Sequence, residues 1–426
     1  MRRVVVTGIG IVTPLGVGTD ATWEGLVAGR SAVGPIEGFD ASSLRTQLAA
    51  ELDDFDATQF APRKALRSMT RNDQLAVAGA ALAAEDAALE APEEGDDERA
   101  RRGLYVGSNK EVSNLQPILD GVLYAQAEDG SLDLGLLGEN ARSAFPPLYY
   151  VEGLQAASLF YVSQAHGLMG ANAYFAGTAA ASAAAVGSAF RAVRRGDVDV
   201  AIAGGCDDAT SWWNMTKFDT LGLLTDENDL GPAACRPYDV ERRGAVLGEG
   251  SAFLVLEEAD HARARGATAH AEIRGFGRAF DAHGLLTPDP AGRPLAAAIA
   301  AALRDADAGT ADVGYVVTHG CGTRLGDASE GRGLRAAFGS EAPAASSVKA
   351  ATGHLVGGAG ALNAAVAALA VRHGTLPPTL NLETPDRACA DIDWVTAARE
   401  TQPGVTVALA RGLEGQNVAL VVSAAA

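Results

Sequence analysis

A run of small residues at Ala171–Ala189, ANAYFAGTAAASAAAVGSA, constrains the fold more than any other stretch of the chain. Tyr174-Phe175 are typical of the end of a buried strand, and Gly177 supplies a sharp turn. The alanines from Ala179 onward predict a closely packed helix, whose N-terminus lowers a thiol's pKa and stabilises an oxyanion. Such a turn suits a nucleophile, yet here it carries alanine. The alternative is a core helix that packs on a sheet through Ala and Gly.

The composition indicates a soluble, cytoplasmic globular protein. Its 426 residues, 48% of them hydrophobic, suffice for two domains or one duplicated unit. The formal net charge of −19 disfavours binding to nucleic acid or to an anionic membrane surface. We expect no signal peptide and no membrane span. Widely spaced cysteines without a CxxC pair argue for a reducing compartment and against a disulfide framework or a metal site; they are Cys206, Cys235, Cys321 and Cys389.

The glycines near the N-terminus do not predict a dinucleotide site. Arg3–Thr7 predicts a buried strand, followed by a Gly-rich turn with Gly8, Gly10 and Gly16. Pro14 falls where the helix of a GxGxxG site would begin, and the glycine spacing differs from that motif. We therefore expect no cofactor.

The order strand–helix–strand occurs twice along the chain. The first series ends near Leu256, and VVVTGIG at the start and YVVTHGCGT in the second half occupy similar places. Helices rich in Gly and Ala suit a position between two sheets. The pattern predicts two stacked α/β halves, residues 1–256 with the turn at 177–182, and residues 257–426 with two histidine motifs.

The segment Asn109–Val162 has weak periodicity and gathers aromatic residues. A long insertion of this kind in a compact α/β protein is typical of a lid or an interface, and the alternative is an ordinary covering loop. The aromatic candidates for an interface are Tyr149, Tyr150, Phe160 and Tyr161.

Two histidines stand in Gly-rich settings, in HGCGTRLGDASE and in SSVKAATGHLVGGAGAL. The glycines beside His319 and His354 let a ligand approach the backbone, which favours a catalytic interpretation over a packed or solvated histidine. Lys349 precedes the second histidine and Glu330 could form an ion pair with it. That pair would hold the imidazoles in place.

Taken together, these motifs resemble those of the β-ketoacyl synthase family, which has the thiolase-like fold. HGCGT…GD…E resembles the family's HGTGT…GD…E, and VKAATGH resembles its VKS-x-x-GH. CRPYDVERRGAVLGEG resembles its RPFD…R-x-G…GEGA, and GTLPPTLNLETPD has a close family equivalent. The match runs from about residue 2 to about residue 423. The resemblance implies two duplicated α/β halves stacked as αβαβα layers.

The family's functional residues carry over only in part. Its catalytic histidines fall on His319 and His354, and its lysine falls on Lys349. The nucleophilic cysteine of its TAC motif falls on Ala180, or on Ala179 when the match is made from the helix side. The family's Gly-Phe-Gly-Gly gating loop is ALARGLEGQN here, with Leu413 and Glu414 in place of the flexible gate. Two further departures are Arg243, where an aspartate is common, and Ala245, where an aromatic residue is common.

These departures imply a chain that does not condense on its own, because condensation in the family needs a thiolate to accept the acyl chain. Losing the nucleophile and the gate matches the chain-length factor of type II polyketide synthases. That subunit forms a heterodimer with a cysteine-bearing ketosynthase and bounds the tunnel into which the polyketide grows. The retained histidines are unusual for aromatic-polyketide chain-length factors and favour a branch that makes reduced or polyene chains.

The partners implied are thus a ketosynthase and an acyl carrier protein that, given the charge of −19, docks mainly on the ketosynthase. Tyr149, Tyr150, Phe160 and Tyr161 become candidates for lining or ending the tunnel. Two alternatives stay open. The chain is a decarboxylase of malonyl-carrier that uses both histidines, or it is an active synthase whose cysteine was replaced by alanine.

Overall fold

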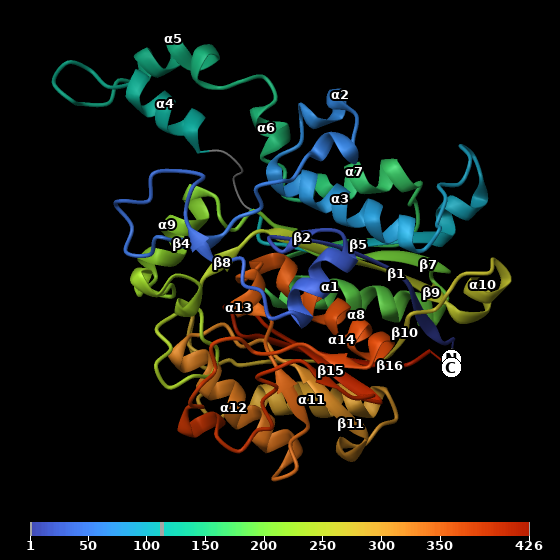
Figure 1. Ribbon diagram of the computed structural model, residues 1–426. Helices are drawn as coiled ribbons and strands as arrows, with labels where there is room; N and C mark the ends of the chain where they lie inside the picture. Colours follow the sequence, from blue (N-terminus) through green and yellow to red (C-terminus); the bar gives the residue numbers. More distant parts are fainter. Residues whose placement is uncertain (1, 111–114, 426) are drawn as a thin grey trace.

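The computed structural model describes residues 2–110 and 115–425, and strands from both ends of the sequence build one large sheet (Figure 1). Within this described part, eleven strands join in the order β12-β11-β15-β16-β10-β1-β9-β7-β5-β6, and β2 pairs with β1 beside this path. Their bounds are β1 (Val4–Thr13), β2 (Gly16–Val17), β5 (Arg102–Ser108), β6 (Asn172–Ala176), β7 (Val200–Asp207), β9 (Gly250–Glu258), β10 (Ala271–Phe280), β11 (Val313–Val317), β12 (Ala344–Ser346), β15 (Val405–Arg411) and β16 (Gln416–Ser423).

The sheet consists of two halves with one topology. In the first half β9 is antiparallel to β1 and β7, and β5 is parallel to β7 and β6. In the second, β16 is antiparallel to β10 and β15, and β11 is parallel to β15 and β12. β1 and β10 join the halves in an antiparallel pair with Val4 opposite Ile273. The predicted duplication is confirmed.

Helices form three layers around these halves. α8 (Ala180–Arg195) and α14 (Ala359–His373) lie between them, where α8 contacts β5 and β16 and α14 contacts β9 and β15. α3 (Arg71–Asp86) and α7 (Ala157–His166) cover the outer face of the first half. α11 (Arg293–Asp305) and α12 (Arg324–Phe338) lie outside the second half (Figure 1). This is the thiolase-like αβαβα stack.

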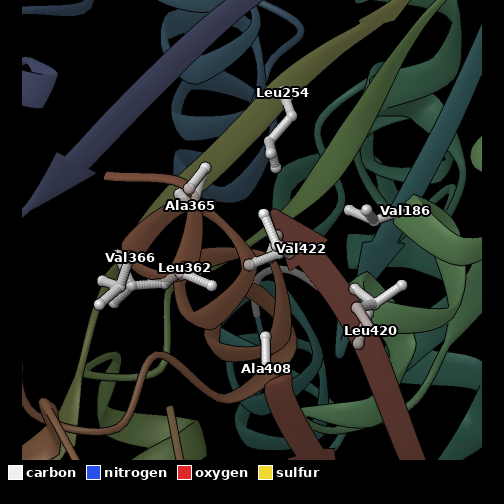
Figure 2. Packing of buried hydrophobic residues seen from close by; sticks show 14 of the residues in the cluster. Val186, Leu254, Leu362, Ala365, Val366, Ala408, Leu420 and Val422 are labelled. Atoms are coloured by element: carbon white, nitrogen blue, oxygen red, sulfur yellow. The ribbon is translucent and has the colours of Figure 1, made fainter. Parts of the chain in front are cut away.

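The core between the halves is apolar and closely packed. Figure 2 shows side chains of the strands packed against those of the two central helices. Leu254, Leu420 and Val422 come from strands and Val186 and Leu362 from α8 and α14, and all are at most 2% exposed. Small residues let the helix backbones approach each other. A Cβ added at Gly360 of α14 would lie 2.3 Å from the carbonyl oxygen of Ala179, directly before α8. The start of α8 is therefore fixed by its neighbour.

The prediction of a Gly-rich turn after Thr7 is wrong, because β1 continues to Thr13. Gly8 and Gly10 lie inside the strand, where an added Cβ would come within 2.1 Å of carbonyl oxygens of α3. The strand needs these glycines for close packing with the helix rather than for a turn.

The second half repeats this packing at Gly275 and Gly277 of β10, which face α11 in the same way at 2.2 and 2.1 Å. Asp86 accepts a hydrogen bond from the N–H of Ile9, between the first two glycines, and Asp305 accepts one from Phe276. The counterpart of the N-terminal VVVTGIG is therefore β10. The proposed similarity to YVVTHGCGT is wrong, because that segment forms β11 and the loop after it.

Short elements complete the fold. The strands are β3 (Gly34–Pro35), β4 (Leu48–Ala50), β8 (Leu247–Gly248), β13 (Thr375–Leu376) and β14 (Arg399–Glu400), and the helices are α1 (Thr19–Val27), α2 (Arg63–Leu66), α9 (Trp212–Thr220), α10 (Ala259–Ala264) and α13 (Lys349–Thr352). No helix of the described residues is long and apolar enough to cross a membrane.

The weakly patterned insertion is largely helical in its described residues, and residues 111–114 of it lie outside them. It contains α4 (Gln116–Tyr124), α5 (Leu134–Ala144) and α6 (Tyr149–Glu152) before α7, and α4 and α5 stand apart from the body of the molecule (Figure 1). Exposed large apolar side chains gather here, including Leu123, Leu132, Leu134, Tyr150 and Phe160, each at least 60% exposed. Such a surface is typical of an interaction site.

Candidate functional site

A cavity of about 310 Å³ lies where loops from both halves meet. Thr178, His319 and His354 all line it, together with Leu413 from the loop between β15 and β16. Much of the remaining wall is apolar or small, including Phe218, Leu224, Ala245, Leu247, Val356 and Gly412. The two predicted histidines thus share one cavity.

His319 follows β11 and His354 follows α13, so the duplicated second half supplies both rings. Their centroids are 5.3 Å apart and their planes meet at 76°. Both rings can therefore contact one small group between them.

Backbone N–H groups fix the protonation of both rings. Nδ1 of His354 accepts a hydrogen bond from Val356 at 2.9 Å, and Nδ1 of His319 accepts one from Arg411 at 3.4 Å. Burial lowers the pKa of each histidine well below 6.5, and the charge of Lys349 lowers it further. Both rings are neutral, with the proton on Nε2, and each offers one N–H donor.

Lys349 and Glu330 do not form the direct ion pair that we expected. The ammonium of Lys349 donates to the carbonyl oxygen of His319. The carboxylate of Glu330 accepts from the backbone N–H groups of His319 and Gly320 at 2.8 and 2.9 Å, and from the hydroxyl of Tyr238. Both side chains bind the peptide groups on either side of His319 rather than each other, so the expected ion pair does not form. They hold the same loop from two directions.

Asp327 holds the next residues of this loop. It accepts hydrogen bonds from the backbone N–H groups of Cys321 and Gly322, both at 3.1 Å, and from the backbone N–H of Tyr238 at 2.8 Å. Burial raises the pKa of Asp327 to about 6. The carboxylates after HGCGT therefore act as backbone anchors.

The alanines at the turn do not face the histidines. Gly177 turns the chain with a φ of 143° and α8 begins at Ala180. Ala179 is fully buried, and Ala180 lies on a second cavity of about 480 Å³. The residue of the turn that lines the histidine cavity is Thr178. Sequence reasoning assigned Thr178 to the turn alone, although its hydroxyl was the one polar group available there.

The gate-equivalent residues contact this threonine. The N–H of Leu413 donates to Thr178 Oγ1 at 2.8 Å. Thr178 in turn donates from its backbone N–H and its hydroxyl to the two carboxylate oxygens of Glu414, at 3.2 and 3.1 Å. Residues 236 positions apart thus form one closed hydrogen-bonded unit.

The four aromatic candidates lie on α6 and α7, outside both cavities. Tyr150 and Phe160 are 77% and 60% exposed, and Tyr149 packs edge to face on Phe145. Tyr161 is buried against α3 and donates its hydroxyl hydrogen to the carbonyl oxygen of Ser68. Within this chain Tyr161 is a core contact.

One cysteine, Cys321, lines the histidine cavity. Burial raises the pKa of its thiol, so it is protonated at neutral pH. In the described part of the chain no three His, Cys, Asp or Glu side chains gather as metal ligands.

Comparisons with known proteins match this chain to one family over most of its length. The family model "Beta-ketoacyl synthase, N-terminal domain" matches residues 1–262, and "Beta-ketoacyl synthase, C-terminal domain" matches residues 270–383.

Individual relatives cover nearly the whole chain. The chain is 37% identical to 3-oxoacyl-[acyl-carrier-protein] synthase 2 of Coxiella burnetii, over 99% of this chain and 98% of that protein. It is 36% identical to oxytetracycline polyketide putative beta-ketoacyl synthase 1 of Streptomyces rimosus, over 99% and 97%. The structure titled "The ishigamide ketosynthase/chain length factor" superposes with a TM-score of 0.86 and 29% identity, over the full length of both chains.

Proposed function

Since the chain belongs to the β-ketoacyl synthase family, we propose that it is a non-condensing ketosynthase-like subunit, a chain-length factor, of a type II polyketide synthase. It forms a heterodimer with a cysteine-bearing ketosynthase and bounds the space into which the chain grows, in a branch that makes reduced or polyene products. Relatives named as polyketide synthases and a structural neighbour named as a ketosynthase/chain length factor support the class of reaction.

The observation that carries the proposal is the chemistry of the turn before α8. Ala179 and Ala180 have no nucleophilic atom, and Thr178 carries a hydroxyl already engaged by Leu413 and Glu414. The one thiol on the cavity, Cys321, is kept protonated by burial. Covalent transfer of an acyl chain from a thioester needs an activated nucleophile, and none is available here.

Two features support a partner subunit. β6 is an edge strand, and its residues are half-buried to exposed, whereas β12, its counterpart at the other edge of the sheet, is buried. An open strand edge is a place where another chain adds. The exposed apolar side chains of α4–α7 are a second candidate contact surface.

The test uses the purified chain alone and together with a cysteine-bearing ketosynthase of a type II polyketide synthase. Alone, with malonyl-carrier and an acyl-carrier primer, the chain forms no condensation product and intact-protein mass spectrometry detects no acyl adduct. Together, the two subunits elute as one complex and the product length differs from that of the ketosynthase alone. An acyl group bound to this polypeptide during turnover overturns the proposal.

A second candidate, decarboxylation of malonyl-carrier, is favoured by the tautomers of the histidines. A malonyl thioester placed between them loses CO₂, and the Nε2–H donors of His319 and His354 stabilise the enolate oxygen that forms. Protonation of the enolate carbon then gives an acetyl thioester, so no covalent intermediate is needed.

Release of CO₂ from malonyl-carrier measures this activity, and His319→Ala abolishes it. No CO₂ release above background from the unaltered chain removes this candidate. The gene sequence decides whether the alanine is native or was introduced into an active synthase.

A further inference from the structure

Arg411 is a buried arginine at the end of β15, and it lines the histidine cavity. Its side chain makes bonds in several directions although the residue is 6% exposed. The Nε group donates to Oδ1 of Asn417, and the Nη1 and Nη2 groups donate to the carbonyl oxygen of Gly326 and the hydroxyl of Ser329, each at 3.0 Å. Oδ2 of Asp281 lies 3.5 Å from Nη2 and balances the charge. A guanidinium group held in this way has a fixed position.

Two of these acceptors, Gly326 and Ser329, lie on α12. Each directly precedes one of the carboxylates, Asp327 and Glu330, that hold the backbone N–H groups of the loop after β11. The side chain of Arg411 thus binds α12 next to both of these anchors. It fixes the loop that carries the first histidine relative to β15.

The main chain of Arg411 contacts the ring of His319. Its N–H donates to Nδ1 of the ring at 3.4 Å. A ring nitrogen that accepts a hydrogen bond carries no proton, so the proton of the neutral ring is on Nε2. Because this bond is long, it depends on the position of β15 relative to the loop after β11. The guanidinium group of the same residue fixes that position.

The charges around His319 also favour its neutral form. The groups that face the ring or its peptide units come from the elements packed on it, and they are Lys349 of α13, His354, Glu330 of α12 and Arg411 of β15. Burial lowers the pKa of His319 most, and Lys349, His354 and Arg411 lower it further. Without Arg411 one positive charge near the ring is lost and the charge of Asp281 is unbalanced. Both changes favour the imidazolium form.

We propose that Arg411 is a positioning residue for His319: its guanidinium group fixes β15 against α12, so that its own N–H holds the ring in the tautomer with the proton on Nε2. This state of the ring does not depend on the proposed function. Its use, donation from Nε2–H to an enolate oxygen, rests on the second candidate function, decarboxylation of malonyl-carrier.

Nitrogen NMR of the full chain with isotope-labelled histidine tests this role. His319→Asn identifies the signals of His319 by their loss. For the unaltered chain at pH 7 we expect an unprotonated Nδ1 and a protonated Nε2 in this ring. Arg411→Met keeps an apolar stem and removes the charge and the donors. We expect it to give a mixture of tautomers and to raise the titration midpoint of His319 by about one pH unit or more.

Arg411→Lys separates the charge from the hydrogen bonds, because lysine keeps the charge and lacks the planar fork of donors. We expect the low titration midpoint of His319 to remain and the tautomers to become mixed. Arg324→Met is the matched control, since Arg324 lines the same cavity but is exposed to solvent. It should leave both the tautomer and the midpoint of His319 unchanged.

Two results overturn the inference. The first is a protonated Nδ1 of His319 in the unaltered chain at pH 7, and this measurement needs no variant to fold. The second is an Arg411→Met chain that keeps both the tautomer and the midpoint, with a melting temperature close to that of the unaltered chain. If Arg411→Met unfolds, Arg411→Lys takes its place, and an unmixed tautomer in that variant overturns the inference.

Release of CO₂ from malonyl-carrier gives a separate measurement. We expect Arg411→Lys to lower kcat about tenfold with KM little changed, because the donor to the enolate oxygen acts in the transition state. If the unaltered chain releases no CO₂, the second candidate function fails, while the NMR result still decides the role of Arg411.

Discussion

Thr178 presents the side chain of the turn before α8 that lines the cavity of the two histidines. The TAC resemblance directed attention to Ala180 or Ala179, because sequence spacing says nothing about which way a side chain points at a helix start. The histidines were predictable, since each is enclosed by glycines in a recognisable motif. The partners of Glu330 and Lys349 were not, because charged residues in buried loops bind peptide groups as readily as each other.

The orientation of the turn can be checked with introduced thiols. Thr178→Cys places a thiol on the histidine cavity at the start of a helix, whereas Ala179→Cys places one in the core. We expect iodoacetamide to modify the first at least about tenfold faster than the second. The four native cysteines are buried, so the unaltered chain gives a low background. Equal rates would show that the turn points elsewhere.

The buried neutral histidines make stability depend on pH. Because the folded pKa of His354 lies well below its unfolded value near 6.5, its contribution is complete above pH 6.5 and decreases as the pH falls below it. His354→Asn keeps an acceptor for the Val356 N–H and removes the titration. Between pH 6.5 and 5 the unaltered chain should lose up to about 1.4 kcal/mol of unfolding free energy per pH unit more than this variant.

Urea unfolding at several pH values measures this difference. Asp327, whose pKa of about 6 is raised by burial, has the opposite pH dependence in this range, but it is present in both proteins and cancels. His283→Asn, at an exposed position, is the control. Parallel pH profiles for the unaltered chain and His354→Asn would contradict the buried neutral state.

At the scale of elements, the continuous apolar strands and Ala-rich helices were predictable, and α8 begins at Ala180, one residue after the start that the run of alanines predicts. The extent of β1 was not predictable, because a glycine in the sequence is equally compatible with a turn and with a strand that packs closely against a helix, as Gly8 and Gly10 do. Only the contact with α3 distinguishes the two.

The repeated strand–helix contact predicts a large effect of one methyl group. In Gly277→Ala the new Cβ would lie 2.1 Å from the carbonyl oxygen of Ala298, and the backbone must shift. We expect a loss of about 3 kcal/mol or more of unfolding free energy. Gly34→Ala, where no atom lies within 4 Å of the new Cβ, should change it by less than about 1 kcal/mol. Similar losses for both would refute the packing argument.

At the scale of the whole molecule, the order of motifs predicted the family and the fold of two duplicated α/β halves. The division of the chain at residue 256 stays a prediction. A single chain cannot predict what covers its open edge. The exposed apolar surface over α4–α7 suits contact with the proposed ketosynthase subunit. The net charge of −19 suits docking of the acyl carrier protein on that ketosynthase rather than on this chain.

Phe160→Glu tests the partner surface. Because Phe160 is 60% exposed, the variant should fold alone with an unchanged melting temperature, yet size-exclusion chromatography should show loss of the complex with the ketosynthase. Arg263→Glu, exposed on α10, should leave the complex intact. A stable Phe160→Glu complex would place the partner elsewhere.

If Phe160 also ends the tunnel, Phe160→Ala lengthens the product. An unchanged product length would show that Phe160 only contacts neighbouring residues or the partner.

The matching strand orders of the two halves have an evolutionary consequence. The turn after β6 and the segment after β12, which leads through α13 to His354, occupy equivalent places in the two halves, so a gene duplication would derive two sides of the cavity from one ancestral loop. After such a gene doubling, each copy was free to diverge. A descendant could then lose the nucleophile from the first half while the histidine N–H donors of the second half were kept.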